Sequence, residues 1–294
     1  MTPAFSLTGI AKRYPHFALR DITLQLPEGQ VMGLVGANGA GKTTLLRLLT
    51  GLAAPDEGQV TVLGHRLPGA QVAAKRDIGF ASEDMRLYRG QSLRWHMDLV
   101  RRIYPGWDEA YAADLLRRFE LRAGQALGGC SHGQRVKAVL LLCLARRPRL
   151  LLLDEPTTGL DPVARIEVLE ALADVLRDER RSVLFSSHNT HDVEQLADTI
   201  SFVHRGRLVA SADRHAFVDR WRRVLCHGTL PEGLDAWPEI ASARTSGSLV
   251  EIKARAWNDG LQARLAAQGL QLQRSDPMAL EDIFITSVRS GGMA

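Results

Sequence analysis

Apolar residues follow two different patterns along this chain. Short continuous apolar runs at 31–35, 150–153 and 183–185 are bounded by glycine, proline or charged residues. Such runs are typical of strands that are buried on both faces, as in a parallel sheet. Between the last two runs, residues 162–180 carry apolar side chains at three- and four-residue spacing, which indicates an amphipathic helix. This alternation of strand and helix predicts a doubly wound α/β core.

Other regions depart from this pattern. Strict alternation of apolar and polar residues predicts a small antiparallel sheet from three segments, 5–7, 22–26 and 59–63. Residues 88–147 carry mainly helical apolar stripes and are interpreted as an inserted helical subdomain. Beyond 212 the chain mixes short strands and helices. We therefore expect one domain at 1–212 and a small α+β domain at 213–294.

Composition and charge exclude several classes of protein. With 294 residues, 45% hydrophobic and 24% charged, the chain has the composition of a folded globular protein. The net charge of +4 is too small for a dedicated DNA-coating protein, so no nucleic-acid partner is expected. The longest apolar stretch, 138–145, is far shorter than the roughly 20 residues of a membrane span. No secretory signal is visible at 1–10, and three cysteines without metal-type spacing suggest reduced thiols and a cytoplasmic location.

A phosphate-binding loop is indicated by eight residues that begin at Gly36. They satisfy the pattern G-x-x-x-x-G-K-[ST] and stand between the predicted strand at 31–35 and a predicted helix. Backbone N–H groups of such a loop cradle phosphate oxygens, Lys42 contacts the β- and γ-phosphates, and Thr43 offers its hydroxyl to Mg²⁺. A glycine-rich turn without a ligand is the weaker alternative. The predicted nucleotide-binding residues are Gly36, Asn38, Gly39, Ala40, Gly41, Lys42, Thr43 and Thr44.

Two adjacent carboxylates, Asp154 and Glu155, follow the apolar run at 150–153. Alone, such a pair is typical of a solvated turn. Beside a phosphate loop, Asp154 can hold Mg²⁺ through a water and Glu155 can orient or deprotonate the attacking water. His188 follows a further strand, at the sheet edge where ligands of open α/β sheets collect, and can donate to the γ-phosphate. Glu155, His188 and Lys42 are the predicted catalytic residues.

The order and spacing of these motifs resemble the ATP-binding cassette (ABC) family. Gly159-Leu160-Asp161-Pro162 and Ser186-Ser187-His188 follow the two carboxylates as in that family, and Cys130-Ser131-His132-Gly133-Gln134 occupies the place of its L-S-G-G-Q segment. The resemblance covers about residues 4–211 and is closest to bacterial exporter-type (ABC-2-like) cassettes. It implies the P-loop ABC ATPase fold, with a RecA-like parallel core, an antiparallel β annex and an inserted helical subdomain.

The resemblance also assigns roles to individual residues. Tyr14 matches the aromatic residue that stacks on adenine. Ser131, Gly133 and Gln134 match the segment that closes over the γ-phosphate of ATP bound to another subunit, and Asp161 matches the residue that links the two sites. It therefore implies a homodimer, or a heterodimer with a second ABC ATPase, with ATP and Mg²⁺ as cofactors.

Two positions depart from the family pattern. Glu83 stands where the family usually has a glutamine that touches Mg²⁺ or the attacking water. An ionised carboxylate keeps the metal contact but cannot donate a hydrogen bond, so Glu83 joins Thr43 and Asp154 as an expected metal ligand. Cys130 and His132 replace the leucine and the first glycine of L-S-G-G-Q. His132 either adds a donor near the phosphate or points to solvent, and hydrolysis is expected in both cases.

The combined expectation is an ATP-hydrolysing subunit that powers a separately encoded membrane permease, an exporter, through ATP-driven closure of a dimer. Such a subunit is peripheral on the inner face of the cell membrane. The alternative is a soluble ABC-type ATPase that acts on ribosomes or DNA without a permease. A single cassette, the lack of long heptad repeats and the nearly balanced charge argue against it. A P-loop kinase or GTPase would leave residues 130–134 and His188 without a role.

Overall fold

The computed structural model describes residues 3–82, 84–104, 106–175, 177–178 and 180–290. Its contacts divide the chain into two compact units. The first comprises Met1–Asp198 and Val203–Leu208, and the second comprises Thr199–Phe202 and Val209–Ala294. The longer part of the second unit begins at Val209, shortly before the boundary that we expect between 212 and 213. That boundary stays a prediction.

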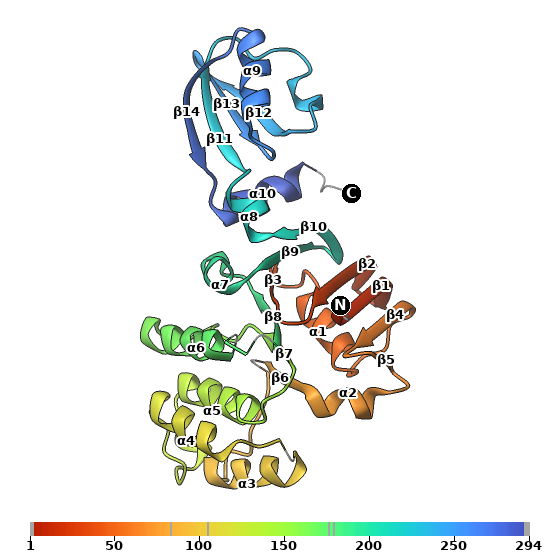
Figure 1. Ribbon diagram of the computed structural model, residues 1–294, viewed down its shortest axis with the longest axis vertical. Helices are drawn as coiled ribbons and strands as arrows, with labels where there is room; N and C mark the ends of the chain where they lie inside the picture. The colour runs from red at the N-terminus through yellow and green to blue at the C-terminus, as the bar shows by residue number, and fades with distance from the viewer. Residues whose placement is uncertain (1–2, 83, 105, 176, 179, 291–294) are drawn as a thin grey trace. The chain divides into compact units, whose positions relative to one another are not determined.

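Four parallel strands of a six-stranded sheet form the centre of the first unit (Figure 1). Its strand order is β10-β9-β3-β8-β7-β6. The strands span β3 (Val31–Val35), β6 (Ile78–Ser82), β7 (Leu150–Asp154), β8 (Ser182–Ser187), β9 (Thr199–His204) and β10 (Arg207–Asp213). The four strands from β3 to β6 in this order are parallel. Every residue of β3 and β7 is buried, which confirms the interpretation of the continuous apolar runs.

Helices cover both faces of this sheet. In Figure 1, α6 (Pro162–Val175) and α7 (Thr190–Leu196) lie on one face, and α1 (Lys42–Leu49) lies on the other. The helix predicted over 162–180 was too long, because Arg177 already lies in a turn. There the backbone N–H of Arg181 donates to the carbonyl of Asp178 at 2.9 Å, which directs the chain into β8.

The predicted antiparallel annex is a four-stranded sheet with the order β2-β1-β4-β5. Its strands are β1 (Pro3–Tyr14), β2 (Phe17–Pro27), β4 (Glu57–Val62) and β5 (His65–Leu67), and α2 (Gln71–Asp77) follows them. The inward residues of β1, β2 and β4 pack with α1 in one hydrophobic cluster. The annex therefore anchors the helix that carries Lys42.

Two glycines of the annex, Gly58 and Gly64, both have a positive φ, but other atoms lie close to only one of them. Gly58 has φ +89° and a Cβ there would lie 2.4 Å from the carbonyl oxygen of Gly9, whereas Gly64 has φ +80° with nothing within 4 Å. We expect Gly64→Ala to lose about 1 kcal/mol in free energy of unfolding, since alanine disfavours positive φ. Gly58→Ala should lose clearly more, about 3 kcal/mol, because the backbone must also move. Urea unfolding of both variants measures the difference, and equal losses would contradict the steric argument.

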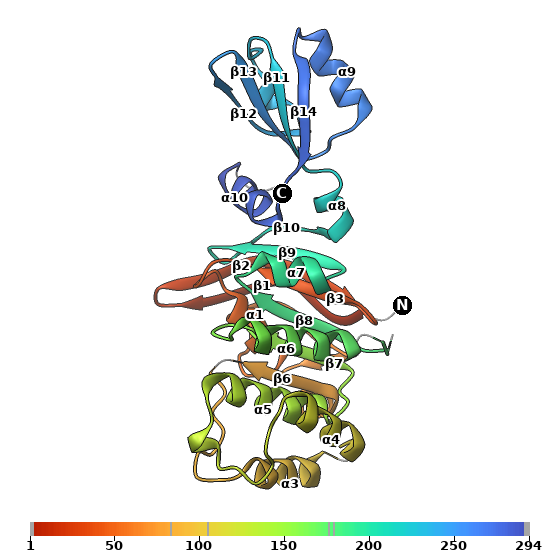
Figure 2. The same ribbon diagram turned by 90° about the vertical axis from the view of Figure 1, so that its left-hand side faces the viewer.

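The inserted helical lobe contains α3 (Leu93–Ile103), α4 (Glu109–Arg118) and α5 (His132–Leu144), seen at one end of the first unit in Figure 2. Each helix begins at a capping side chain, Ser92, Asp108 or Ser131, that accepts a hydrogen bond from a backbone N–H three residues later. Residues 137–144 of α5 are all buried. In the described part of the chain, no helix combines the length and apolar character that a membrane span requires.

The second unit contains another antiparallel sheet with the order β12-β13-β11-β14. It comprises β11 (Arg222–His227), β12 (Ile240–Ser246), β13 (Leu249–Ala254) and β14 (Gln271–Pro277), and its helices are α8 (Arg214–Val218), α9 (Asp259–Ala267) and α10 (Leu280–Arg289). Leu261 and Leu265 of α9 pack against the buried residues of β11 and β13. The unit therefore has the expected α+β composition.

Candidate active site

The phosphate loop connects β3 to α1 and lines a cavity of about 550 Å³. Its residues 37–44 share this cavity with His16, Phe17, Asp84, Asp154 and Glu155. Gly41 has φ +117°, and a Cβ there would lie 2.6 Å from a methyl carbon of Leu19. Only glycine allows this close turn into α1, so the loop requires the residue that its motif specifies.

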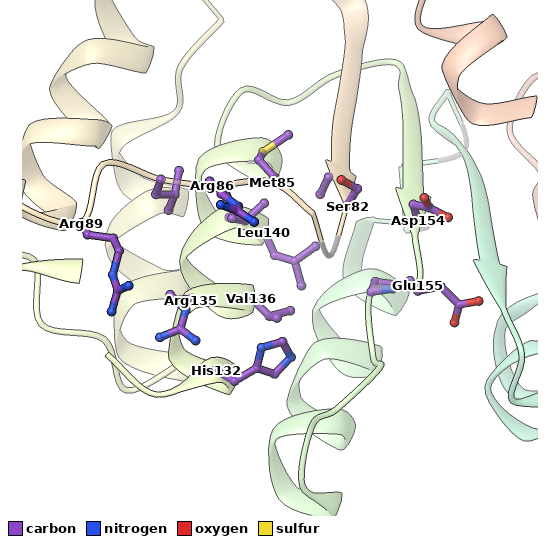
Figure 3. Close-up of a pocket in the computed structure, with 14 residues that line it drawn as sticks. Ser82, Met85, Arg86, Arg89, His132, Arg135, Val136, Leu140, Asp154 and Glu155 are labelled. Carbon is purple, nitrogen blue, oxygen red and sulfur yellow. The ribbon is translucent and has the colours of Figure 1, made fainter. Parts of the chain in front are cut away.

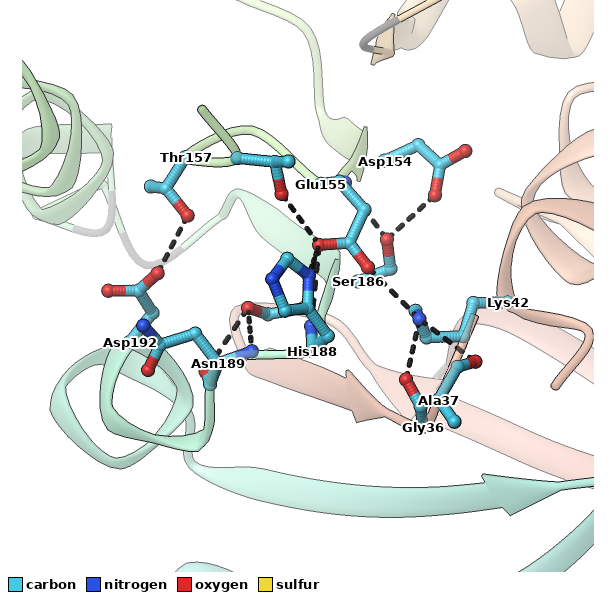
Figure 4. A network of polar contacts seen from close by, with 12 residues as sticks. Gly36, Ala37, Lys42, Asp154, Glu155, Thr157, Ser186, His188, Asn189 and Asp192 are labelled. Carbon is cyan, nitrogen blue, oxygen red and sulfur yellow. Dashed lines mark hydrogen bonds and ion pairs between the residues drawn. The ribbon is translucent and has the colours of Figure 1, made fainter. Parts of the chain in front are cut away.

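Lys42 is the first residue of α1 and points back along its own loop (Figure 4). Its Nζ donates to the carbonyl oxygen of Gly36 at 2.6 Å and lies 3.0 Å from Oε1 of Glu155. The side chain is buried, with only 5% of the residue exposed. An ammonium group has three hydrogens to donate, so Lys42 joins the phosphate loop to the carboxylate after β7.

Glu155 is held in place by groups from three segments. Its Oε2 accepts hydrogen bonds from the hydroxyl of Thr158 at 2.9 Å and from the backbone N–H of His188 at 3.3 Å. Nδ1 of His188 lies 2.8 Å from the same oxygen and donates in the tautomer that carries hydrogen there. Glu155 also has φ +52°, the left-handed region that costs a non-glycine residue about 1–2 kcal/mol. Such strain concentrates at functional sites.

The pKa of the Glu155 carboxyl is lowered from its ordinary value. Burial by itself raises this pKa, but the ammonium of Lys42 and hydrogen bonds from His188 and Thr158 outweigh it. The carboxyl is therefore ionised near neutral pH, as a group that accepts a proton from water must be.

The lowered pKa also makes Glu155 a pH-dependent source of stability. A carboxyl whose pKa is lower in the folded state stabilises the fold above its unfolded pKa, and this contribution is lost as pH falls through the folded pKa. We expect the free energy of unfolding of the wild type to fall relative to that of Glu155→Gln as pH is lowered from 7 through the ordinary value of 4.5. Urea unfolding of both proteins across this pH range measures the difference in free energy of unfolding. A difference that does not change with pH would contradict the lowered pKa of Glu155.

Ser186 connects the two carboxylates, and sequence reasoning gave it no role. Its hydroxyl donates to Oδ1 of Asp154 at 2.7 Å and its oxygen accepts from the backbone N–H of Glu155 at 2.9 Å. The parallel register of β7 and β8 places Asp154 directly beside Ser186. Aligning the ends of the two apolar runs as neighbouring parallel strands would have placed Ser186 beside Asp154, so the sequence did contain a signal for this residue.

A second polar network lies behind the loop after β7. Asp192 is 1% exposed and accepts from the hydroxyl of Thr157 at 2.6 Å and from Nε of Arg165 at 2.6 Å. These bonds fasten α6 and α7 to the segment that carries Glu155, as Figure 4 shows for Thr157 and Asp192. Because Asp192 is 35 and 27 positions away from Thr157 and Arg165 in the sequence, no local motif indicates that these residues meet.

The structure gathers the predicted phosphate-loop residues with Asp154, Glu155 and His188, but not every predicted residue. Tyr14 is 41% exposed at the end of β1, and among the described residues His16 and Phe17 line the cavity instead. Glu83 lies outside the described residues. The adenine-stacking role of Tyr14 and the metal contact of Glu83 stay predictions.

The residues expected to act on another subunit lie at two helix starts. Ser131 and Gln134 form a reciprocal capping box at the start of α5, with Gly133 between them, and Asp161 accepts from the backbone N–H groups of Val163 and Ala164 in α6. None of these four predicted residues lines the phosphate-loop cavity of its own chain.

His132, at the start of α5, contacts the loop before α6 in the same chain. Its Nε2 lies 3.2 Å from the carbonyl oxygen of Thr158. A Cβ on Gly159 would lie 3.0 Å from the same nitrogen. The imidazole of His132 thus packs on the loop before α6. The sequence analysis expected this side chain either near the phosphate or in solvent, and so did not include this contact.

Comparison with known proteins identifies the family of this chain. A family model described as ABC transporter matches residues 19–158. ABC transporter ATP-binding protein YtrB of Bacillus subtilis is 33% identical over 70% of this chain and 70% of its own length. Nod factor export ATP-binding protein I of Sinorhizobium fredii is 31% identical over 96% of this chain and 85% of its own length.

Solved structures show the same fold. The ATP-binding subunit of an ABC transporter superposes with a TM-score of 0.67 at 28% identity, over 74% of this chain and 92% of that one. A dimeric ATP-binding cassette in a post-hydrolysis state has a TM-score of 0.64 at 21% identity, over 71% of this chain and 98% of that one. The chain therefore belongs to the family of ATP-binding and ATP-hydrolysing subunits of ABC transporters.

Proposed function

We propose that this chain drives export through a separately encoded membrane permease, with Glu155 as its catalytic base. The observation that carries the proposal is the group formed by Lys42, Glu155 and His188, of which Lys42 and Glu155 line the phosphate-loop cavity. In this group Glu155 lies within hydrogen-bond distance of both the ammonium of Lys42 and the imidazole of His188. Support for export comes from the Nod factor export relative, which aligns with almost the whole chain.

The chemistry follows from the partners of these groups. Phosphate oxygens compete with Gly36 and Glu155 for the ammonium of Lys42. Glu155 then keeps its bonds to His188 and Thr158, which aim its carboxylate at a water beside the γ-phosphate. The carboxylate orients that water and accepts its proton as it attacks phosphorus, and this positioned base contributes about 10²–10⁴ in rate.

Thr43 and Asp154 fit a magnesium ion. Both line the cavity with oxygen donors, and Ser186 occupies only Oδ1 of Asp154, which leaves Oδ2 for a cation. Among the described residues, no cluster of three or more His, Cys, Asp or Glu side chains is arranged to hold a metal. Mg²⁺ suits such a site, because it binds through one or two protein oxygens plus substrate phosphates. When bound, it neutralises charge on the β- and γ-phosphates.

A second subunit would complete each nucleotide site. Ser131, Gly133 and Gln134 stand away from their own phosphate-loop cavity, at a helix start whose N–H groups suit an anion. ABC ATPases form dimers, and the post-hydrolysis cassette is one example. We infer that these residues and Asp161 contact ATP on a partner, which is a second copy or another ABC ATPase.

An apolar groove of about 380 Å³ offers a docking site for the permease. Leu52, Ile78 and Phe80 line it together with Val100 and Leu142 of the helical lobe. Phe80 belongs to β6, whose last residue Ser82 pairs with Asp154 of β7. A permease segment in this groove would thus press on the strand next to the catalytic carboxylates.

Affinity capture tests the proposed function. The Glu155→Gln protein, held with ATP, is expected to retain a polytopic membrane protein in stoichiometric amount from detergent-solubilised membranes of the source cell. Leu52→Glu in the groove should abolish this capture, and Leu272→Glu, a matched change on β14, should not. Recovery of ribosomal or DNA-associated proteins alone would favour the soluble ATPase instead.

The hydroxyl of Ser186 gives a further test of the site. Ser186→Ala removes a charge-assisted hydrogen bond to Asp154 and leaves the N–H of Glu155 without its acceptor. We expect hydrolysis to fall about tenfold, with a smaller change in ATP affinity. Ser187→Ala is the control, because its hydroxyl bonds Asn189 instead. Equal activity of the two variants in a phosphate-release assay would argue against the role of Ser186.

A further inference from the structure

A second cavity, of about 490 Å³, lies beside the catalytic carboxylates in the first unit. Asp154 and Glu155 form one wall (Figure 3). The opposite wall belongs to α5, which contributes Arg135, and to residues 85–89, which contribute Arg86 and Arg89. Asp154 and Glu155 also line the phosphate-loop cavity. The two cavities therefore meet where the γ-phosphate would be cleaved.

The arginine side of this cavity carries positive charge that the described residues do not neutralise. Among the residues that the structure describes, no carboxylate forms an ion pair with Arg86, Arg89 or Arg135. Nη1 of Arg135 donates to the carbonyl oxygen of Cys130 at 2.5 Å, which leaves its other N–H groups for a ligand. Asp154 and Glu155 are the only acidic residues among the described lining residues, and both already have partners.

The remaining wall strengthens attraction for an anion. Met85, Val136 and Leu140 present apolar side chains between the arginines and the carboxylates. Charges interact more strongly beside such a wall than in bulk water. Guanidinium groups bind phosphate oxygens in a planar, often bidentate arrangement. The volume holds a hydrated anion easily, since a water takes up about 30 Å³.

We propose that this cavity is a transient binding site for inorganic phosphate, the product of hydrolysis, on its way from the phosphate loop to solvent. The inference rests on the proposed function. Phosphate formed beside Asp154 and Glu155 is repelled by these carboxylates and drawn to Arg135, Arg86 and Arg89 across the cavity. Charge thus directs the product away from the ADP that remains on the loop.

Equilibrium dialysis of radioactive inorganic phosphate against the full chain tests the site without requiring hydrolysis. A saturating, non-hydrolysable ATP analogue with Mg²⁺ fills the phosphate loop, so that remaining binding reports other sites. The double variant Arg86→Gln/Arg135→Gln is expected to bind phosphate at least about tenfold more weakly than the wild type. Arg86→Gln alone, on an exposed segment, should give an intermediate loss and guards against misfolding of the double variant.

The matched control is Arg94→Gln/Arg102→Gln, which removes the same charge from exposed positions of α3 outside the cavity. It should leave phosphate affinity and ATP hydrolysis unchanged. Unchanged affinity in the cavity variants, or an equal loss in the control, would overturn the phosphate site. A wild type that binds phosphate through these arginines but fails to hydrolyse ATP would instead contradict the proposed function, so the two failures are distinguishable.

Inhibition of steady-state hydrolysis by added phosphate provides a second readout. The inhibition constant for phosphate should rise about tenfold in Arg86→Gln/Arg135→Gln and stay unchanged in the control. Sulfate, another tetrahedral dianion, should compete with phosphate for the wild-type site, whereas chloride at equal ionic strength should not. Equal effects of the two salts would indicate general charge screening and contradict the site.

Discussion

Replacing Glu155 by glutamine is expected to reduce ATP hydrolysis at least about 100-fold while ATP still binds. The amide keeps the size of the side chain, and its one oxygen can still accept either from Lys42 or from Thr158 and His188, which contact different oxygens of Glu155. It cannot accept a proton from the attacking water. It also removes a negative charge from beside the triphosphate, so ATP affinity should stay equal or increase. Single-turnover hydrolysis and filter binding of ATP measure the two quantities separately.

Under the proposed function the same variant should accumulate as a dimer in ATP, because bound ATP would close the dimer and only its cleavage would reopen it. Light scattering in ATP and in ADP provides the comparison. A monomer in ATP would count against the proposed role of Ser131 and Asp161 on the partner. Residual hydrolysis near the wild-type rate would remove Glu155 from the role of base and leave His188, which lies 2.8 Å away, as the next candidate.

The residues of the candidate site could be located from the sequence because they lie in short motifs. The phosphate loop, Asp154 and Glu155 each lie within or directly after a predicted strand, and parallel strands bring their carboxyl ends to one edge. The structure places Lys42 within 3.0 Å of Glu155 accordingly. The parallel core and the antiparallel annex were predictable for the same reason, since burial on one or two faces sets the apolar pattern.

What the sequence did not reveal are partners that depend on register or on distant segments. Ser186 meets Asp154 only because β7 and β8 pair in one register. Asp192 meets Thr157 and Arg165 across 35 and 27 positions of sequence, with nothing local to mark it. The left-handed φ of Glu155 is likewise imposed by the surrounding bonds and not by its own preference.

Replacing Lys42 by alanine is the complementary test, with the larger effect on binding. The change removes the ammonium that would contact the β- and γ-phosphates, and each charge-assisted hydrogen bond is worth about 1.5–3 kcal/mol. ATP affinity should therefore fall about 10- to 100-fold in a filter-binding assay. Lys253→Ala, in the second unit, is the control for loss of a lysine. Unchanged ATP affinity of Lys42→Ala would contradict the phosphate-loop assignment.

Lys42→Ala also separates the two roles of this lysine, because Glu155 loses its ion-pair partner as well. With burial no longer outweighed by the ammonium, the pKa of the Glu155 carboxyl should rise. Hydrolysis by Lys42→Ala at saturating ATP should then decline at a higher pH than in the wild type as the solution is acidified. Lys42→Arg restores a positive charge beside Glu155 and should move that acidic limb back even if ATP affinity stays low. An acidic limb that is the same in all three proteins would show that Lys42 does not keep Glu155 ionised.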